Sequence, residues 1–135
     1  MNDMKQIAIY TRSATKSRDT WMEENKEHYN DIISQHPTWK LTDIYYDTGS
    51  NSNTSRKPDF NRMVSDCQSG YIDLILTKSI ATFSRNIIDV IMTVRKLSSL
   101  TPPVGVYFES EEIFTLNDTS SLNFLSEIKN SPAIL

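Results

Sequence analysis

Glycine is scarce in this sequence, with three residues among 135. The phosphate loop of nucleoside triphosphatases and the dinucleotide-binding fingerprint each need several glycines in one short segment. No segment of the chain meets that requirement, so neither class of nucleotide-binding protein fits. Carboxylate pairs and sets of His and Cys with metal-ligand spacing are also missing, and the two histidines fall near one predicted helix end. We therefore expect no cofactor and no metal.

Cysteine and long apolar runs are equally rare. Cys67 is the only cysteine, which excludes an internal disulfide and favours a reducing cytoplasm, and its position suits a small core residue. No apolar run reaches the length of a membrane span, and the N-terminus lacks the apolar stretch of a signal peptide. These absences predict a cytoplasmic protein without a membrane partner.

Basic residues do not predominate either, because 14 Lys and Arg stand against 17 Asp and Glu, a formal net charge of −3. A free-standing nucleic-acid binder is usually basic. If DNA is the partner, most of the affinity must therefore come from elsewhere. The apolar content suffices for one domain with a hydrophobic core, since 38% of the residues are hydrophobic and 10% are aromatic.

Short apolar runs alternate with segments of helical periodicity along the chain. The runs that read as strands lie at 4–10, 39–46, 72–76 and 104–109, with a short extended piece at 113–116. This alternation indicates an α/β fold, a mostly parallel four- to five-stranded sheet with helices on both faces. The predicted core consists of Ile7, Ile9, Ile44, Ile72, Leu74, Leu76, Val90, Val94, Val106 and Phe108.

Capping and breaking residues bound the predicted helices. Thr20 has capping-box spacing to the first helix, and Pro58 suits the first turn of the second. Asn86 offers a cap for the third helix, which the prolines at 102 and 103 close. A last amphipathic segment carries Leu122, Leu125 and Ile128.

Polar, hydroxyl-rich loops follow the first and third predicted strands, at 11–19 and 79–85. In a parallel sheet both loops lie at the same edge, where ligands bind. Arg12 and Arg85 could therefore converge on one anion, and the planar guanidinium fork suits phosphate oxygens. Lys57, with Arg56 beside it, precedes a helix N-terminus, which also favours anions. The spacing thus suggests a phosphate site, with a solvated loop edge bearing surface ion pairs as the alternative.

Five segments, in order and with consistent gaps, cover nearly the whole chain and carry loose motifs of one family: Tyr10–Thr15, Tyr45–Ser50, Lys57–Met63, Gly70–Ile80 and Phe83–Asn86. Together they resemble the N-terminal catalytic domain of serine recombinases, of the resolvase/invertase and large serine recombinase type. The resemblance implies that residues 1–135 form a resolvase-type catalytic domain, which we expect to be part of a longer recombinase of a mobile element.

The same resemblance implies metal-independent, site-specific cleavage and exchange of DNA strands during recombination or integration. A serine hydroxyl attacks the scissile phosphodiester and leaves a 5′-phosphoserine link, while arginines balance the charge that grows on the phosphate. It also implies a homodimer that becomes a tetramer in the synaptic complex. DNA would be bound mainly through a C-terminal region that is missing from this chain.

Departures from the family pattern fall on the expected catalytic positions, which are Arg12, Ser13, Ala14, Lys57, Thr82 and Arg85. Ala14 stands where the family has its nucleophile, Thr82 replaces an arginine, and Lys57 aligns with another. Ser13 is one residue early, and in an extended backbone its side chain would face the opposite side. The domain is therefore expected to be impaired or inactive in cleavage unless Ser13 or Thr15 substitutes.

Two other interpretations remain open at this point. The first is a non-enzymatic, resolvase-like module that keeps the fold for self-association or regulation. The second is an unrelated flavodoxin-like signalling or nucleotide-binding domain, although that class would need an acidic cluster or a glycine-rich turn after the first strand. The sequence carries neither feature there.

Overall fold

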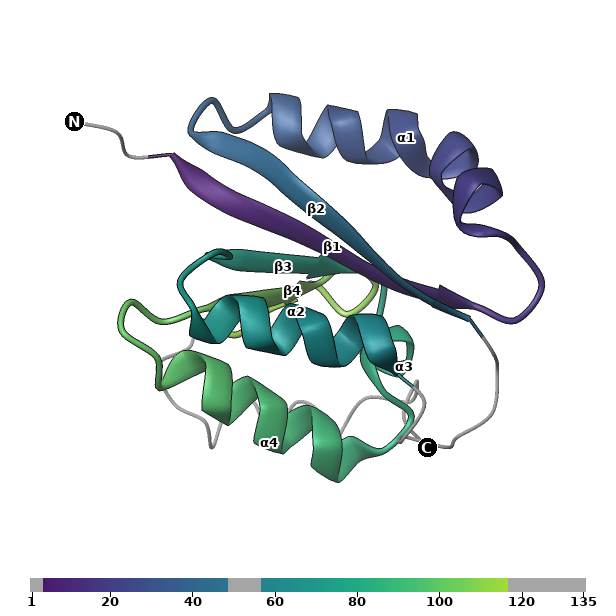
Figure 1. Cartoon of the computed structure of the whole chain (residues 1–135). Coiled ribbons are helices and arrows are strands. Elements are labelled where there is room, and N and C mark those ends of the chain that lie inside the picture. Colours follow the sequence, from purple (N-terminus) through teal and green to yellow (C-terminus); the bar gives the residue numbers. More distant parts are fainter. Residues whose placement is uncertain (1–3, 49–56, 117–135) are drawn as a thin grey trace.

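Five strands form a single sheet in the order β2-β1-β3-β4-β5 in the computed structural model, which describes residues 4–48 and 57–116. The first four strands of this order are parallel, and β5 runs antiparallel to β4. The predicted mostly parallel α/β sheet is therefore confirmed (Figure 1). In chain order the elements are β1 (Lys5–Ser13), α1 (Arg18–Ser34), β2 (Trp39–Thr48), α2 (Pro58–Gln68), β3 (Leu74–Thr77), α3 (Ile80–Phe83), α4 (Ile87–Ser98), β4 (Gly105–Phe108) and β5 (Ile113–Phe114).

The alternation of side chains along β1 divides the core between the two faces of the sheet. Ala8 and Tyr10 pack with residues of α2, α3 and α4 in one cluster. Ile7 and Ile9 pack with Tyr29 of α1 in the other. Figure 1 shows the same arrangement, with α1 on one side of the sheet and α2 and α4 on the other. Helices thus cover both faces, as predicted, but unequally.

The predicted core agrees closely with the buried residues. Nine of the ten predicted residues are at most 7% exposed. The tenth, Ile44, is partly buried against the cluster that contains Tyr29 of α1. Cys67 is buried in the larger cluster, as its position suggested. Among the described residues, no helix is both long enough and apolar enough to cross a membrane.

The carboxyl end of β1 extends further than the sequence indicated. β1 continues to Ser13, because Arg12 pairs with Asp47 and Ser13 pairs with Thr48 of β2. The predicted loop at 11–19 was therefore wrong at its start. The cap of α1 was also wrong, since the side chain of Ser17, not Thr20, accepts the hydrogen bond that begins the helix.

A one-turn helix, α3, occupies part of the predicted loop at 79–85. Ser79 caps this turn, and its buried residues Ile80 and Phe83 hold it against the core. The next predicted cap is confirmed, because the side chain of Asn86 accepts from the backbone N–H groups of residues 88 and 89 at the start of α4. α2 likewise begins at Pro58, as predicted. The last predicted segment, at 122–128, lies outside the described residues.

Candidate anion-binding site

Arg12 lies near the carboxyl end of β1, on the face that bears α2 and α4. The alternation that places Tyr10 in the cluster under these helices also directs Arg12 to that face. Its positive charge helps to lower the pKa of Lys57, so the two cations act on each other electrostatically. The two residues are 45 positions apart in the sequence, and the convergence of cations on one anion stays a prediction.

Lys57 occupies the N-cap position of α2 and is 5% exposed. Its ammonium Nζ lies 3.3 Å from Ser84 Oγ and 4.7 Å from the centroid of the Phe60 ring. Burial lowers the pKa of Lys57, and the charge of Arg12 lowers it further. The carboxylates of Asp89 and Asp47 act in the opposite direction but do not reverse the shift. The site therefore holds a desolvated ammonium beside a guanidinium.

Asp47 fixes the start of α2 against the sheet. Its Oδ1 accepts from the backbone N–H of Asp59 at 2.9 Å, and its Oδ2 accepts from Phe60 N at 3.0 Å. The same Oδ2 accepts from the Tyr10 hydroxyl at 2.9 Å. The side chain of Asp47 thus does the capping that Lys57, which has no side-chain cap bond, does not.

Ser84 links the ammonium to the segment between α3 and α4. Besides the contact with Lys57, its Oγ accepts from the backbone N–H of Asn86 at 3.2 Å, and the residue is 3% exposed. Arg85 follows directly and is exposed. The sequence indicated Ser84 only as one of several hydroxyls in this region. Its pairing with Lys57 depends on tertiary structure and has no local signal.

Ser13 and Ala14 lie at the end of β1. Ser13 Oγ accepts from the backbone N–H groups of Thr15 at 3.3 Å and Lys16 at 3.1 Å. Since β1 stays extended as far as Ser13, alternation directs this side chain to the α1 face, opposite to Arg12. Ala14 follows the strand and is exposed. The Ser13 hydroxyl is therefore engaged in a local turn, while Thr15 is exposed.

Thr82 lies within α3 and is partly buried. Its Oγ1 is 2.9 Å from Ser79 Oγ, and its backbone N–H donates to the same oxygen at 3.0 Å. The contacts of the Thr82 side chain thus belong to the cap of the short helix. Of the six predicted positions, Arg12 and Lys57 interact electrostatically, and Arg85 directly follows Ser84, which contacts Lys57.

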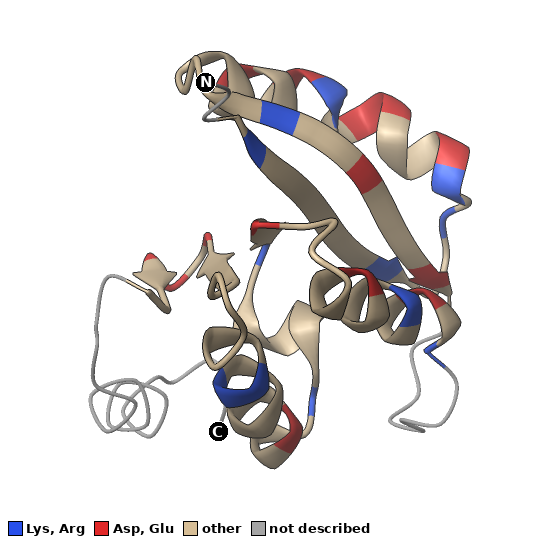
Figure 2. Ribbon diagram, turned by 60° about the vertical axis from the view of Figure 1, so that its left-hand side comes forward, with Lys and Arg blue, Asp and Glu red and all other residues tan. Residues whose placement is uncertain are grey.

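Charge over the described ribbon is mixed. Figure 2 shows acidic positions beside basic ones on α1, α2 and the strands. The positive charge of Arg12 and Lys57 is thus a local feature within a ribbon on which basic and acidic positions are interspersed. Within the same residues, no group of three or more His, Cys, Asp or Glu could hold a metal ion.

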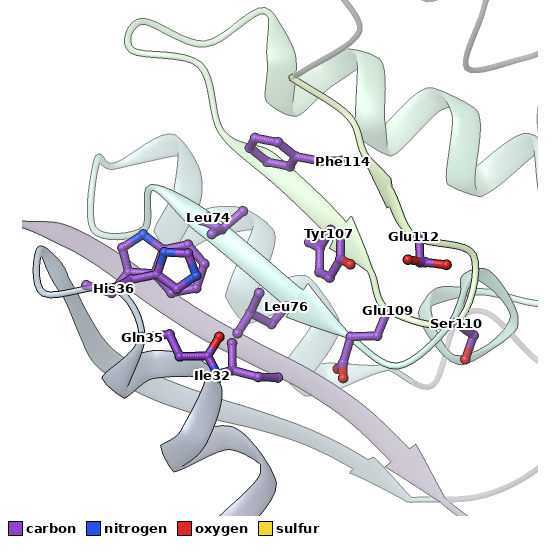
Figure 3. A pocket seen from close by; sticks show the side chains of 11 residues that line it. Ile32, Gln35, His36, Leu74, Leu76, Tyr107, Glu109, Ser110, Glu112 and Phe114 are labelled. Atoms are coloured by element: carbon purple, nitrogen blue, oxygen red, sulfur yellow. The ribbon is translucent and has the colours of Figure 1, made fainter.

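A cavity of about 670 Å³ lies on the other face of the sheet, beside α1. In Figure 3, side chains of β3, β4 and β5 line it together with the end of α1. The lining is largely apolar, with Leu74, Leu76, Tyr107 and Phe114 on the sheet. None of the predicted catalytic positions contributes to this cavity, so it is separate from the candidate anion site.

The comparisons with known proteins agree on one family. Residues 7–130 match the family model described as Resolvase, N terminal domain. No curated protein matches the chain. The N-terminal catalytic domain of TP901-1 integrase is similar over 93% of this chain and 94% of that one, with 24% identity and a TM-score of 0.69.

Two further solved structures are also similar. A resolvase family site-specific recombinase from Streptococcus pneumoniae matches over 93% of this chain and 85% of that one, with 20% identity and a TM-score of 0.67. The C-terminal catalytic domain of ISC1926 TnpA, an IS607-like serine recombinase, matches over 77% and 68%, with 15% identity and a TM-score of 0.59. At these identities the structural likenesses establish the resolvase-type fold.

Proposed function

Because the chain belongs to the resolvase N-terminal domain family of serine recombinases, we propose that it is a site-specific recombinase catalytic domain that holds the scissile phosphodiester of DNA but is impaired in cleaving it. Arg12, Lys57 and Arg85 are the phosphate-binding residues in this proposal. Ala14 occupies the position of the attacking serine, and Thr82 occupies the position of a further cation.

The observation that carries the proposal is the buried Lys57 ammonium, which lies 3.3 Å from Ser84 Oγ and is repelled by the charge of Arg12. Two like charges in a desolvated place repel each other, and each would be stabilised by an anion between them. A phosphodiester provides one negative charge and two free oxygens, which match guanidinium and ammonium donors. Arg85, on the adjoining exposed segment, is free of the core and can approach the same phosphate from solvent.

Strand cleavage requires a nucleophile as well as these cations. In the family reaction a serine Oγ forms a bond to phosphorus as its proton leaves, and the bond to the 3′ oxygen breaks to give a free 3′-hydroxyl. The methyl group of Ala14 has no atom that can do this. The Ser13 side chain accepts two local N–H bonds on the other face of the sheet, which supports an inactive centre.

We further propose that DNA affinity comes mainly from a separate C-terminal region. The net charge of −3 supports this, because counterion release by Lys and Arg supplies most non-specific DNA affinity. The proposed working assembly is a homodimer that joins a second dimer in a synaptic tetramer. We place this activity in the cytoplasm, which is consistent with the single free, buried Cys67.

A second candidate function is a non-catalytic resolvase-like module that acts through self-association. The replacement at Ala14 favours it, as does the apolar stripe of Ile88 and Met92 on α4, which are 62% and 64% exposed. Sedimentation of the chain at increasing concentration tests association. It does not by itself separate the two functions, because both include dimers.

Trapping of covalent protein–DNA adducts separates them. The complete protein, incubated with DNA that carries its recombination site and then denatured, should give no phosphoserine adduct. It should nevertheless protect the site against nuclease, and Arg12→Ala or Arg85→Ala should reduce protection at the scissile phosphate. The contrary result would be an adduct that forms with the unaltered protein and is lost in Ser13→Ala. That result would show that Ser13 is the nucleophile and that Ala14 does not occupy the nucleophile position. Full protection of the scissile phosphate by the Arg12→Ala variant would count against the phosphate site.

A further inference from the structure

The hydroxyl of Ser84 is a buried junction between two segments that are far apart in sequence. It accepts from Lys57 Nζ at 3.3 Å and from Asn86 N at 3.2 Å. Both Ser84 and Lys57 are at most 5% exposed, so water competes weakly for these contacts. The start of α2 and the start of α4 are thereby connected through one side-chain oxygen.

Lys57 is a buried ammonium without a close carboxylate partner in the described part of the chain. None of the ion pairs among the described residues includes it. Charged groups that act on it are Arg12 from β1, which repels, and Asp47 from β2 and Asp89 from α4, which attract. Both oxygens of Asp47 already accept other donors. A buried charge in this situation is costly unless something else completes its contacts.

The contacts of the Lys57 ammonium do not use all of its hydrogen-bond donors. An ammonium has three N–H donors, and Ser84 accepts one of them. The ring face of Phe60, 4.7 Å away, attracts the charge without using a conventional acceptor. The ammonium therefore keeps donor capacity beyond its bond to Ser84.

We propose that Ser84 is a positioning residue of the phosphodiester site, whose hydroxyl holds the Lys57 ammonium beside Arg12 so that a bound phosphodiester oxygen completes the contacts of that ammonium. The inference rests on the proposed function. It adds a residue that acts through Lys57 without touching the phosphate. It also implies that anion binding depends on the proton of Lys57, because the neutral amine would attract the phosphate much less.

Dimethyl phosphate is a suitable probe, since a phosphodiester monoanion has no second ionisable oxygen to confuse a pH titration. The affinity of the 135-residue chain for it can be followed by NMR through the amide groups of Ser84 and Arg85 and the side-chain signals of Lys57. Ser84→Ala should weaken binding about ten-fold or more, the usual order for one hydrogen bond to a charged group. Ser99→Ala is the matched control, because Ser99 is an exposed serine at the other end of α4 whose hydroxyl donates only to a local carbonyl.

A double-mutant cycle distinguishes positioning from a general structural effect. In a Lys57→Met background, Ser84→Ala should cause no further loss of affinity, because Lys57 is no longer there to be positioned. The affinity of the unaltered chain should also fall as the pH rises through the pKa of Lys57, while Lys57→Met should show no such step and Lys57→Arg should keep binding at higher pH.

The outcomes distinguish a failure of the phosphodiester site from a failure of the role proposed for Ser84. If the unaltered chain does not bind dimethyl phosphate at all, the phosphodiester site and the proposed function fail together. If the unaltered chain binds but Ser84→Ala binds equally well, or loses the same factor with and without Lys57, the role of Ser84 is overturned and the site itself stands. Should Ser84→Ala unfold, Ser84→Thr, which keeps the hydroxyl, must retain the pH step and most of the affinity.

Discussion

The carboxylate of Asp47 accepts a hydrogen bond from the Tyr10 hydroxyl at 2.9 Å, which connects neighbouring parallel strands inside the core. Tyr10 is fully buried and Asp47 is 3% exposed. Because Asp47 also accepts two N–H groups at the start of α2, one side chain sets the relative positions of β1, β2 and α2. Those elements carry Arg12 and Lys57, so the geometry of the anion site depends on this bond.

Asp47→Ala should lower the free energy of unfolding by about 2–4 kcal/mol. The change removes a helix cap, and it leaves the buried Tyr10 hydroxyl without its acceptor. Asp43→Ala is the matched control on the same strand, because the Arg18 and Arg62 pairs of Asp43 are partly exposed and should contribute no more than about 1 kcal/mol. Urea unfolding followed by circular dichroism measures both, and equal losses would contradict the role assigned to Asp47.

Alkaline pH should destabilise the fold, and Tyr10→Phe should reduce that effect. Burial and the nearby charge of Asp47 raise the pKa of Tyr10 well above its ordinary value near 10. The folded chain thus keeps a proton that the unfolded chain loses above about pH 10, and the free energy of unfolding falls as the pH rises further. Burial also raises the pKa of the Cys67 thiol to about 12, which extends the same trend to lower pH.

The measurement for this prediction is the slope of unfolding free energy against pH between about pH 10 and pH 11. Each group of this kind contributes up to about 1.4 kcal/mol per pH unit. Tyr10→Phe should remove one such contribution while lowering stability at neutral pH through the lost hydrogen bond. An unchanged slope in the variant would show that Tyr10 does not hold its proton in the folded state.

Lys57→Met should stabilise the chain while it weakens anion binding. Burial and the charge of Arg12 lower the pKa of Lys57, so its charged form opposes folding at every pH below that pKa. An apolar side chain of similar length removes this cost, and a gain of about 1 kcal/mol at neutral pH is expected. Lys40→Met, on an exposed strand position, should change stability by no more than about 0.5 kcal/mol. A loss of stability in Lys57→Met would mean that the ammonium is already well compensated.

Restoring the chemistry should require two changes. Ala14→Ser alone returns the nucleophile but leaves the phosphate one cation short, and the loss of one preorganised donor typically costs about 10²–10³ in rate. Ala14→Ser combined with Thr82→Arg, in a protein with its own DNA-binding region, should give a detectable covalent adduct. A double variant with Ala14→Ser and Thr82→Gln is the matched control. If Ala14→Ser alone restores full adduct formation, Thr82 is not a missing cation position.

Short sequence patterns correctly predicted the helices and strands that are determined by residues a few positions apart. The apolar alternation of β1, the proline at the start of α2 and the Asn86 cap all depend on residues a few positions apart. The extension of β1 to Ser13 could not be predicted in this way. Thr11, Arg12 and Ser13 have loop-like polarity, and only pairing with the end of β2 makes them a strand. The single turn of α3 is too short to produce a periodic signal.

The candidate site shows the same limit. Arg12, Lys57 and Arg85 were predicted because parallel strands end at one edge and because the family motifs align there. The junction at Ser84 was missed, because a contact between residues 57 and 84 is created by packing of α2 against the segment before α4. The side chains of Ser13 and Thr82 both form hydrogen bonds within local turns. These bonds depend on backbone geometry that the sequence alone did not reveal.

If Ala14 occupies the nucleophile position, as we propose, the alternation of side chains along β1 limits how a nucleophile could arise there during evolution. Moving Ser13 to the Arg12 face would require the strand to slip by one residue, which would turn every side chain to the other side of the sheet. Ile7 and Ile9 would then exchange clusters with Ala8 and Tyr10, and the bond from Tyr10 to Asp47 would be lost. The core therefore opposes any slip of β1 that would bring Ser13 to the Arg12 face, and in the proposed function a serine at position 14 is the shorter route to a nucleophile.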